Sequence, residues 1–253
     1  MKDDNIIESR GLTMEFKGFK AVNGVDLRVR RHSVHALIGP NGAGKTTCFN
    51  LITRFLTPTS GSIFLNGKDI TNTPPAEVAR LGMVRSFQIS ATFPHMTVFE
   101  NVRVALQRKA GMSHRFWASE RSLDMFRDRT HELLDEVDLA PYAHLEAGEL
   151  PYGRKRALEV ATTLALDPEV LLLDEPMAGM GREDIGRMSG LIRKVAKGRT
   201  VLMVEHNLSV VADLSDRITV LARGEVLAEG EYASVSRDPR VVEVYIGRGH
   251  GHA

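Results

Sequence analysis

The chain contains 253 residues, of which 43% are hydrophobic, and its 33 Lys and Arg residues nearly balance its 32 Asp and Glu residues. This length allows one large core or a core with a subdomain. A formal charge of +1 lacks the basic excess expected of a dedicated nucleic-acid binder. No apolar run approaches the roughly 20 residues that a membrane helix needs, and no segment resembles a signal peptide. With Cys48 as the single cysteine, we expect a cytosolic or peripherally bound chain in a reducing compartment.

Short apolar runs dominate the first 65 residues. They predict strands, because turn residues such as Gly18, Asn23-Gly24 and Gly61 separate them. The predicted strands cover residues 6–7, 12–16, 25–29, 34–38 and 63–65.

A glycine-rich loop follows the predicted strand 34–38 and precedes a helix-like stretch from Cys48 to Phe55. It reads Gly39-Pro40-Asn41-Gly42-Ala43-Gly44-Lys45-Thr46-Thr47. This strand, loop and helix order predicts a nucleotide-binding P-loop, and it disfavours the alternative of a glycine turn that merely carries Lys-Thr. The glycines let backbone N–H groups point at phosphate oxygens, and the helix presents its positive end to the same anion. Lys45 is expected to meet the β- and γ-phosphates, and Thr46 to bind Mg²⁺.

Cys48 lies in the first helical turn after the P-loop. At that position a helix dipole can favour the thiolate, so one reading is a reactive cysteine near the nucleotide. The alternative is an inert, buried thiol.

Helical spacing replaces the strand pattern after Phe87. It predicts helices over 98–106, 123–137 and 154–166, with a polar stretch at 111–122 between the first two. Strand and helix alternation then resumes, with strands predicted at 170–173, 200–204 and 218–221 and helices at 184–195 and 208–214.

The aliphatic run 170–173 ends in Asp174-Glu175-Pro176. Such a run suits a parallel strand that is covered on both faces, and its carboxyl end is where α/β sheets place ligand-binding groups. Asp174 can hold Mg²⁺, often through water, and Glu175 can act as a general base toward the attacking water. The alternative is a strand followed by a solvated acidic turn. After the strand 200–204, His206 is a candidate contact for the γ-phosphate, although a lone histidine is more often structural.

Taken together, these motifs resemble the ATP-binding subunits of ABC transporters over nearly the whole chain. Residues 39–47 resemble the Walker A loop, 171–175 the Walker B strand, 86–88 the Q-loop, 150–154 the signature motif, 178–181 the D-loop and 205–206 the H-loop. Phe16 stands where the family stacks an aromatic ring on adenine, and Phe19 is the competing candidate.

The resemblance implies an α/β fold: a P-loop NTPase (ABC ATPase) core with an N-terminal antiparallel β region and an α-helical subdomain. The single domain 1–253 would consist of a core, 1–87 and 160–253, and a helical signature subdomain, 88–159. The implied ligands are ATP and Mg²⁺, with nucleotide contacts from Phe16, Val22 and residues 39–47. The implied metal site is Thr46, Gln88 and Asp174; the implied catalytic residues are Glu175, His206 and Gln88.

The signature residues Leu150, Pro151, Tyr152 and Gly153 would meet the γ-phosphate bound by a partner ATPase, so two subunits would sandwich two ATP molecules. A side chain at Gly153 is expected to occupy the space that this phosphate approaches. Two departures from the family pattern stand out: Pro151-Tyr152 replace the usual Ser-Gly, and Met180-Gly181 leave the D-loop without its acidic residue.

Residues 81–88, the Tyr-Gly signature and the ending 244–247 resemble the branched-chain amino-acid importer ATPases, and 112–128 resembles the extra helical segment of one of that system's two ATPases. The implied partners are membrane permease subunits, docking near residues 88–98, and a second ATPase, with a heterodimer in the cell and a homodimer possible in isolation. A periplasmic binding protein would act indirectly, and no nucleic acid is expected. The chain would lie in the cytoplasm, peripheral on the inner face of the membrane. The transported solute rests on analogy, because importers of urea and amides share this subfamily.

Three other functions are alternatives to this interpretation. A soluble ABC ATPase acting on ribosomes or DNA usually fuses two ATPase halves or carries long coiled-coil insertions, and neither is present. A lipid or lipopolysaccharide exporter is disfavoured by the sequence Arg85-Ser86-Phe87-Gln88. A translational GTPase would need an Asn-Lys-x-Asp motif, which does not occur. The tail 247–252 has two histidines and is interpreted as a disordered end rather than a metal site.

Overall fold

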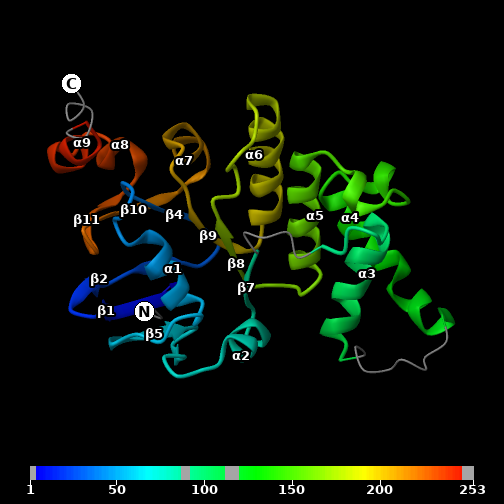
Figure 1. Ribbon diagram of the computed structural model, residues 1–253, viewed down its shortest axis with the longest axis horizontal. Helices are drawn as coiled ribbons and strands as arrows, with labels where there is room; N and C mark the ends of the chain where they lie inside the picture. Colours follow the sequence, from blue (N-terminus) through cyan, green and yellow to red (C-terminus); the bar gives the residue numbers. More distant parts are fainter. Residues whose placement is uncertain (1–3, 87–91, 112–119, 247–253) are drawn as a thin grey trace.

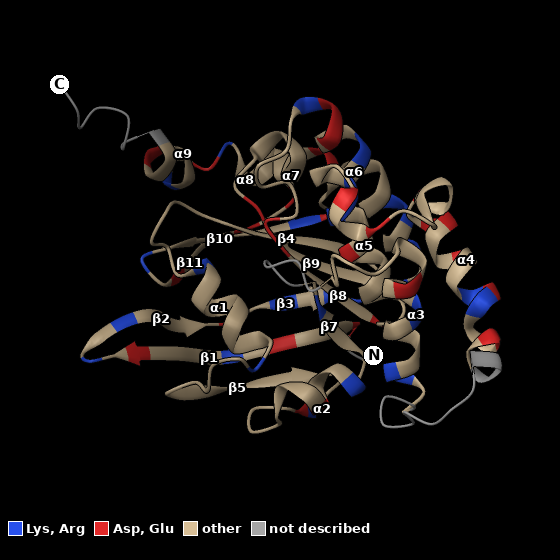
Figure 2. Cartoon of the chain, turned by 45° about the vertical axis from the view of Figure 1, so that its right-hand side comes forward, with Lys and Arg blue, Asp and Glu red and all other residues tan. Residues whose placement is uncertain are grey.

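The structure is a computed structural model that describes residues 4–86, 92–111 and 120–246. Its strands form two sheets, and its helices lie on the faces of these sheets and in a separate group on one side (Figure 1). Within the described ranges no helix is long and apolar enough to cross a lipid bilayer. Basic and acidic residues are interspersed along the elements, as in α4 and α6 (Figure 2).

The first sheet is antiparallel and has the strand order β2-β1-β5-β6, with β3 also paired to β1. Its strands are β1 (Asn5–Phe16), β2 (Phe19–Val25), β3 (Arg28–Arg30), β5 (Ser60–Leu65) and β6 (Lys68–Asp69). The turn between β1 and β2 consists of Lys17 and Gly18, both with positive φ, as a two-residue hairpin turn requires.

Three predicted strands need correction in this sheet. The strands predicted at 6–7 and 12–16 are one strand, β1, whose register shifts around Gly11. Gly11 has a φ of 55°, which lets the strand bend without ending. The strand predicted at 25–29 does not exist as one piece, because β2 ends at Val25 and β3 begins at Arg28.

The second sheet has the order β11-β10-β4-β9-β8-β7, and only the pair β10–β11 is antiparallel. Its strands are β4 (Val34–Ile38), β7 (Met83–Arg85), β8 (Val170–Asp174), β9 (Thr200–Val204), β10 (Arg217–Ala222) and β11 (Glu225–Gly230). Because β4, β8 and β9 are parallel neighbours, their carboxyl ends meet at one edge. The P-loop, Glu175 and His206 therefore all leave the sheet at that edge.

The sheet-face and loop helices are α1 (Lys45–Ile52), α2 (Pro75–Arg80), α6 (Arg182–Ala196), α7 (Leu208–Leu214), α8 (Tyr232–Val235) and α9 (Pro239–Ile246). The group on one side comprises α3 (Val98–Lys109), a 3₁₀ turn (Glu120–Phe126), α4 (Arg127–Glu136), two short 3₁₀ turns (Ala140–Tyr142 and Ala147–Glu149) and α5 (Tyr152–Leu164). Thr97 caps α3 in a capping box with Glu100. The predicted subdomain limit at 159/160 falls inside α5, so α5 belongs to both parts of the proposed division.

The six-stranded sheet separates two hydrophobic cores. In β8, Leu171 and Leu173 pack into the core on the side of α5 and α6, whereas Val170 and Leu172 pack into the core shared with α1 and the antiparallel sheet. This division follows from the alternation of side chains along a strand. Burial on both faces explains why the strand reads as an uninterrupted aliphatic run.

Candidate nucleotide-binding site

The P-loop is pressed closely against two strands. A Cβ atom at Gly39 would lie 2.2 Å from the carbonyl oxygen of Leu221 in β10, and one at Gly44 would lie 2.3 Å from that of Ala21 in β2. Gly44 also has a φ of 96° as it leads into α1. Only glycine fits these two positions, since both the space and the backbone conformation exclude a side chain.

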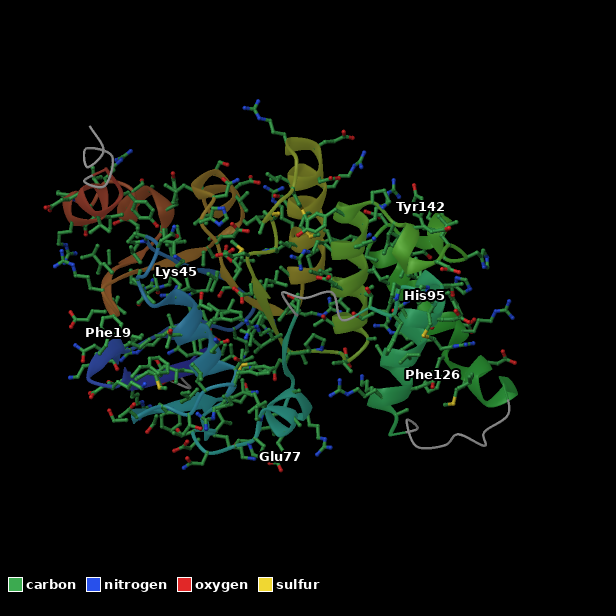
Figure 3. The ribbon with its side chains drawn as sticks, in the orientation of Figure 1. Phe19, Lys45, Glu77, His95, Phe126 and Tyr142 are labelled. Atoms are coloured by element: carbon green, nitrogen blue, oxygen red, sulfur yellow. The ribbon has the colours of Figure 1, made fainter. Side chains whose placement is uncertain are left out.

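Lys45, labelled in Figure 3, is buried at the start of α1, and its hydrogen bonds direct the ammonium group back into the loop. Nζ donates hydrogen bonds to the carbonyl oxygens of Gly39 at 2.7 Å and Pro40 at 3.1 Å. Burial lowers the pKa of Lys45, and the nearby carboxylate of Glu175 acts in the opposite direction. The lysine of the P-loop and the carboxylate that follows β8 are therefore electrostatic neighbours.

Glu175 adopts a left-handed backbone conformation, with φ at 46°. Its N–H donates to Val204 of β9 at 2.9 Å, which fixes the turn directly after β8. A non-glycine residue in this region costs on the order of 1–3 kcal/mol, and such strain clusters at active sites. The conformation turns the chain sharply between buried Asp174 and half-buried Glu175.

Arg85 has no role in the predicted motifs, yet it contacts the Walker B carboxylate and the helix that follows the P-loop. Its guanidinium donates to Asp174 at 2.5 Å and to Asn50 of α1 at 2.6 Å. It also lies over the rings of Phe49 and Phe55, at 4.9 and 5.5 Å from the ring centroids. Arg85 thus joins β7 to the Walker B carboxylate and to the helix that follows the P-loop.

The remaining predicted site residues differ in their exposure. In the P-loop, Asn41, Gly42 and Thr46 are exposed, Pro40 and Thr47 are half-buried, and Ala43 is buried. His206 is exposed directly after β9. Gln88 lies outside the described residues.

For Mg²⁺, the oxygen donors that fit a hard cation are the exposed hydroxyl of Thr46 and the carboxylate of Asp174. Elsewhere the described ranges contain no cluster of three or more His, Cys, Asp or Glu residues able to hold a metal ion.

The residues predicted to contact the nucleotide near adenine differ in their exposure to solvent. Phe16 and Phe19 face each other across the β1–β2 hairpin and are 44% and 67% exposed. Val22 stays a predicted nucleotide contact, and in this structure its side chain is fully buried among core residues next to α1.

Of the two interpretations of Cys48, a reactive cysteine near the nucleotide and an inert, buried thiol, the structure supports the second. It is fully buried, and burial raises its pKa to about 12. The desolvation of a thiolate outweighs the favourable end of the helix at this position.

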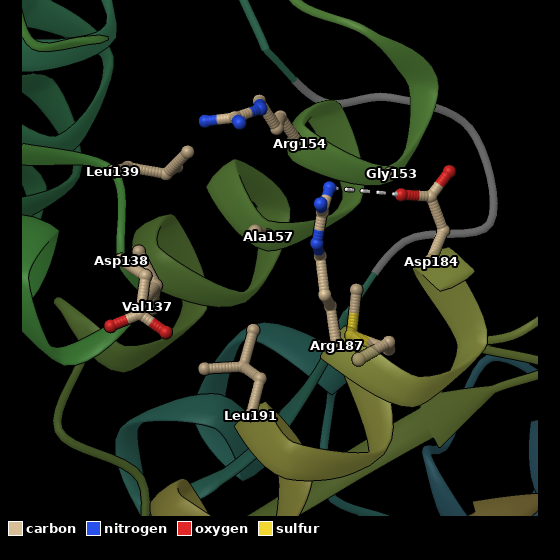
Figure 4. Close-up of a pocket in the computed structure, with 10 residues that line it drawn as sticks. Val137, Asp138, Leu139, Gly153, Arg154, Ala157, Asp184, Arg187 and Leu191 are labelled. Carbon is tan, nitrogen blue, oxygen red and sulfur yellow. Dashed lines mark ion pairs between the residues drawn. The ribbon is translucent and has the colours of Figure 1, made fainter. Parts of the chain in front are cut away.

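The signature segment begins α5 on the other side of the six-stranded sheet. Leu150 is buried, Pro151 and Tyr152 are exposed, and Gly153 is half-buried against Asp184 of α6. A hollow of about 350 Å³ lies beside this contact, and Figure 4 shows Gly153 and Asp184 facing each other at its rim. The signature loop is therefore supported by α6 of its own chain.

Comparison with known proteins identifies the class to which this fold and P-loop belong. The family described as ABC transporter matches residues 22–178. The chain therefore belongs to the ATP-binding proteins of ABC transporters, whose cassettes hydrolyse ATP to power transport. A second family, described as Branched-chain amino acid ATP-binding cassette transporter, matches residues 225–251.

Individual relatives cover nearly the whole chain. The high-affinity branched-chain amino acid transport ATP-binding protein BraF of Pseudomonas aeruginosa is 40% identical, over 96% of this chain and 98% of its own length. The corresponding protein LivG of Escherichia coli K12 is 37% identical over 96% and 98%. Among solved structures, an ATP-binding cassette of an ABC transporter in its ADP conformation superposes with a TM-score of 0.84, at 31% identity, over 96% of this chain and 99% of its own.

Proposed function

We propose that this chain hydrolyses ATP for an importer of branched-chain amino acids or a related small polar solute, bound peripherally to permease subunits on the cytoplasmic face of the membrane. The observation that carries the solute class is the full-length similarity to transport proteins named for branched-chain amino acids. The second family match, at residues 225–251, supports the same class.

In the proposed mechanism the P-loop holds ATP through its backbone N–H groups and the N-terminal end of α1. Lys45 would move its ammonium group from the carbonyls of Gly39 and Pro40 to the β- and γ-phosphates. Glu175 would accept a proton from the attacking water, and His206 would contact the γ-phosphate. Thr46 and Asp174, with Gln88, would hold Mg²⁺, which supplies positive charge beside the phosphates.

Two chains, or this chain and a second ATPase, would enclose each ATP between one P-loop and the opposing segment 150–153. The N-terminal end of α5 can meet a phosphate even though Pro151 offers no hydroxyl, because backbone N–H groups and the helix dipole remain. Dimeric cassettes occur among proteins of the same fold, including one described in a post-hydrolysis state bound to ADP and Pi.

The proposed permease contact lies between β7, α3 and α5. A hollow of about 260 Å³ there is lined by Val84, Arg85, Phe93, Asn101, Val104, Ala105, Arg108, Thr162, Thr163 and Leu166. Phe93 at its rim is 53% exposed. Buried Asn101 fixes the backbone of Phe93, accepting from its N–H at 2.7 Å and donating to its carbonyl at 3.1 Å. An exposed aromatic ring on a hydrogen-bonded stretch of backbone beside a hollow suits an inserted helix of the permease.

Cysteine cross-linking tests this contact directly, because the only native cysteine is buried. Phe93→Cys and His95→Cys should cross-link to a cytoplasmic segment of the permease in the assembled transporter. Val242→Cys, on exposed α9, serves as the matched control. Cross-linking from Val242→Cys alone would refute the placement.

Transport measurements test the solute. The chain, co-produced with permease subunits and a periplasmic binding protein of its transporter, should support ATP-dependent uptake of labelled leucine, competed by isoleucine and valine. Uptake of urea or a short amide without uptake of leucine would exclude branched-chain amino acids and assign a related small polar solute. ATP-dependent uptake of none of these solutes would overturn the proposed solute class while leaving the ATPase assignment intact.

A further inference from the structure

The turn that follows Glu175, residues 177–180, is held at Met177 by the carboxylate of Glu205 and at Ala178 by the hydroxyl of Tyr152, two side-chain contacts that the mechanism above does not use. Internal hydrogen bonds shape the turn: Ala178 N–H donates to Glu175 at 3.0 Å, and Met180 N–H donates to Met177 at 3.2 Å. Hydrogen bonds with Glu205 and Tyr152 fix the turn relative to the rest of the site.

Glu205 is a carboxylate with no exposed surface, at the end of β9. One of its oxygens accepts from the N–H of Met177 at 3.0 Å. The other accepts from the N–H groups of His206 at 3.1 Å and Asn207 at 3.3 Å. A buried charge is costly unless hydrogen bonds satisfy it, and three N–H donors do so here. The carboxylate therefore ties the turn after Glu175 to the loop that carries His206.

Tyr152 approaches the same turn from the signature segment. Its hydroxyl donates to the carbonyl of Ala178 at 3.0 Å. The hydroxyl in turn accepts from Arg156, from Nε at 3.1 Å and from Nη2 at 3.0 Å. Since arginine can only donate, these contacts direct the hydroxyl proton to Ala178. The ring also covers Gly179, where a Cβ atom would lie 3.7 Å from it.

We propose that Glu205 and Tyr152 are positioning residues that fix the turn 177–180 between the His206 loop and the signature segment. Glu175 leads into this turn. Glu205 therefore fixes the position of the Glu175 carboxylate relative to His206. Through Tyr152 the same turn is joined to the segment that serves the opposing ATP. This inference rests on the proposed sandwich arrangement, and it gives a function to the tyrosine that stands in the signature segment.

Two isosteric substitutions remove one tie each. In Glu205→Gln the amide NH₂ faces at least one of the backbone N–H groups that the carboxylate accepted, so a donor meets a donor and that bond is lost. Tyr152→Phe removes only the hydroxyl. Matched controls are Glu132→Gln, on the exposed side of α4, and Tyr142→Phe, whose ring lies under Arg154 away from the turn.

Three measurements are needed on each variant: ATP affinity of the full chain, the ATPase rate of the assembled transporter, and hydrogen exchange of the segment 174–181. Each test variant should lower kcat about tenfold, the equivalent of losing one hydrogen bond that matters in the transition state. ATP affinity should match that of the controls in both variants, while exchange in 174–181 speeds up. Glu205→Gln should also lower the thermal midpoint, because it leaves a buried N–H group without an acceptor. Because both side chains hold the same turn, the fold-loss in kcat of the double variant should be smaller than the product of the two single-variant fold-losses.

Unchanged kcat and unchanged exchange in either variant would overturn the inference. So would a parallel fall in ATP affinity and thermal midpoint, which indicates a general structural role, or a double variant whose loss equals the product of the single losses. Failure of the unaltered chain to bind ATP, or of its transporter to hydrolyse it, would instead contradict the proposed function itself.

Discussion

A Cβ atom at Gly153 would lie 2.8 Å from the carboxyl group of Asp184 in the same chain. A side chain at Gly153 was expected to occupy the space that the partner's phosphate approaches. In the structure such a side chain would meet α6 of its own chain first. Arg187 lies 3.8 Å from the same carboxylate, so Asp184 keeps a cationic neighbour (Figure 4). The start of α5 is thus tightly packed within its own subunit. The same segment is proposed to face a second ATPase subunit.

Gly153→Asp should leave ATP binding by the single chain intact, because the P-loop lies elsewhere, and should abolish ATPase activity in the full complex. It should also lower the thermal midpoint, because two carboxylates would be forced together. The double variant Gly153→Asp/Asp184→Ala should recover the midpoint but not the ATPase rate. Pro151→Ser should be mild. Recovery of turnover in the double variant, or a normal rate in Gly153→Asp, would remove residues 150–153 from the signature role.

Phe16→Ala should weaken ATP binding by on the order of 1–3 kcal/mol, the range measured for stacking of a base on an aromatic side chain. Phe16→Tyr should bind normally, because it preserves the ring. Phe19→Ala is the matched control, since Phe19 is the more exposed ring of the same hairpin. Titration of ATP into each variant decides between them, and an affinity loss in Phe19→Ala alone would transfer the role to Phe19.

Cys48 should resist alkylation in the folded chain at neutral pH, because the thiol is fully buried and its pKa is about 12. Reaction with a thiol reagent should require unfolding, so its rate should rise with urea and should not respond to ATP beyond the effect of ATP on stability. Rapid modification of the native chain, blocked by ATP in proportion to site occupancy, would show that the thiol reaches the nucleotide site.

His35 should make the fold sensitive to mild acid. Burial, with a smaller contribution from the charge of Arg217, lowers the pKa of His35 from 6.5 to about 3, and its Nε2 lies 2.8 Å from the Thr219 hydroxyl. The unfolded chain therefore binds the proton first, so stability is complete above pH 6.5 and falls as the pH drops toward 3. The loss from this group is roughly 1.4 kcal/mol per pH unit in that window.

His35→Gln keeps a neutral partner for Thr219 and should show a shallower loss of unfolding free energy between pH 6 and 4. Urea unfolding of both proteins at several pH values measures the difference, which cancels the contribution of the carboxylates. Parallel curves would mean that His35 is protonated without cost in the folded chain.

Regular, fully buried elements were the part of the fold that the sequence could predict. The limits of β4, β9 and α7 agree with the predicted 34–38, 200–204 and 208–214, because buried parallel strands and short capped helices have clear apolar limits. The strand β11 was missed, since its half-buried residues 225–230 mix polar and apolar types without strict alternation. Helix α4 begins at Arg127 rather than 123, because a 3₁₀ turn precedes it.

The order of the P-loop, Asp174-Glu175 and His206 motifs predicted which segments meet, since parallel strands bring their carboxyl ends to one edge. The order of the motifs does not predict side-chain contacts between residues that lie 26 to 89 positions apart in the sequence. Arg85 reaches Asp174 and Tyr152 reaches Ala178 only through the packing of strands and helices. The burial of Val22 could not be predicted either, because a pattern of residues does not say which face of the bent hairpin β1–β2 turns inward.

The central claim is that Glu175 activates the water that attacks ATP held by the P-loop. ATP affinity and ATPase rate, measured on the unaltered chain and on Glu175→Gln in the assembled transporter, test it most directly. The account predicts unchanged ATP affinity, easier detection of an ATP-dependent dimer, and a rate lowered by about 10²–10⁴, the usual contribution of a general base. Turnover by Glu175→Gln at the unaltered rate would contradict the account.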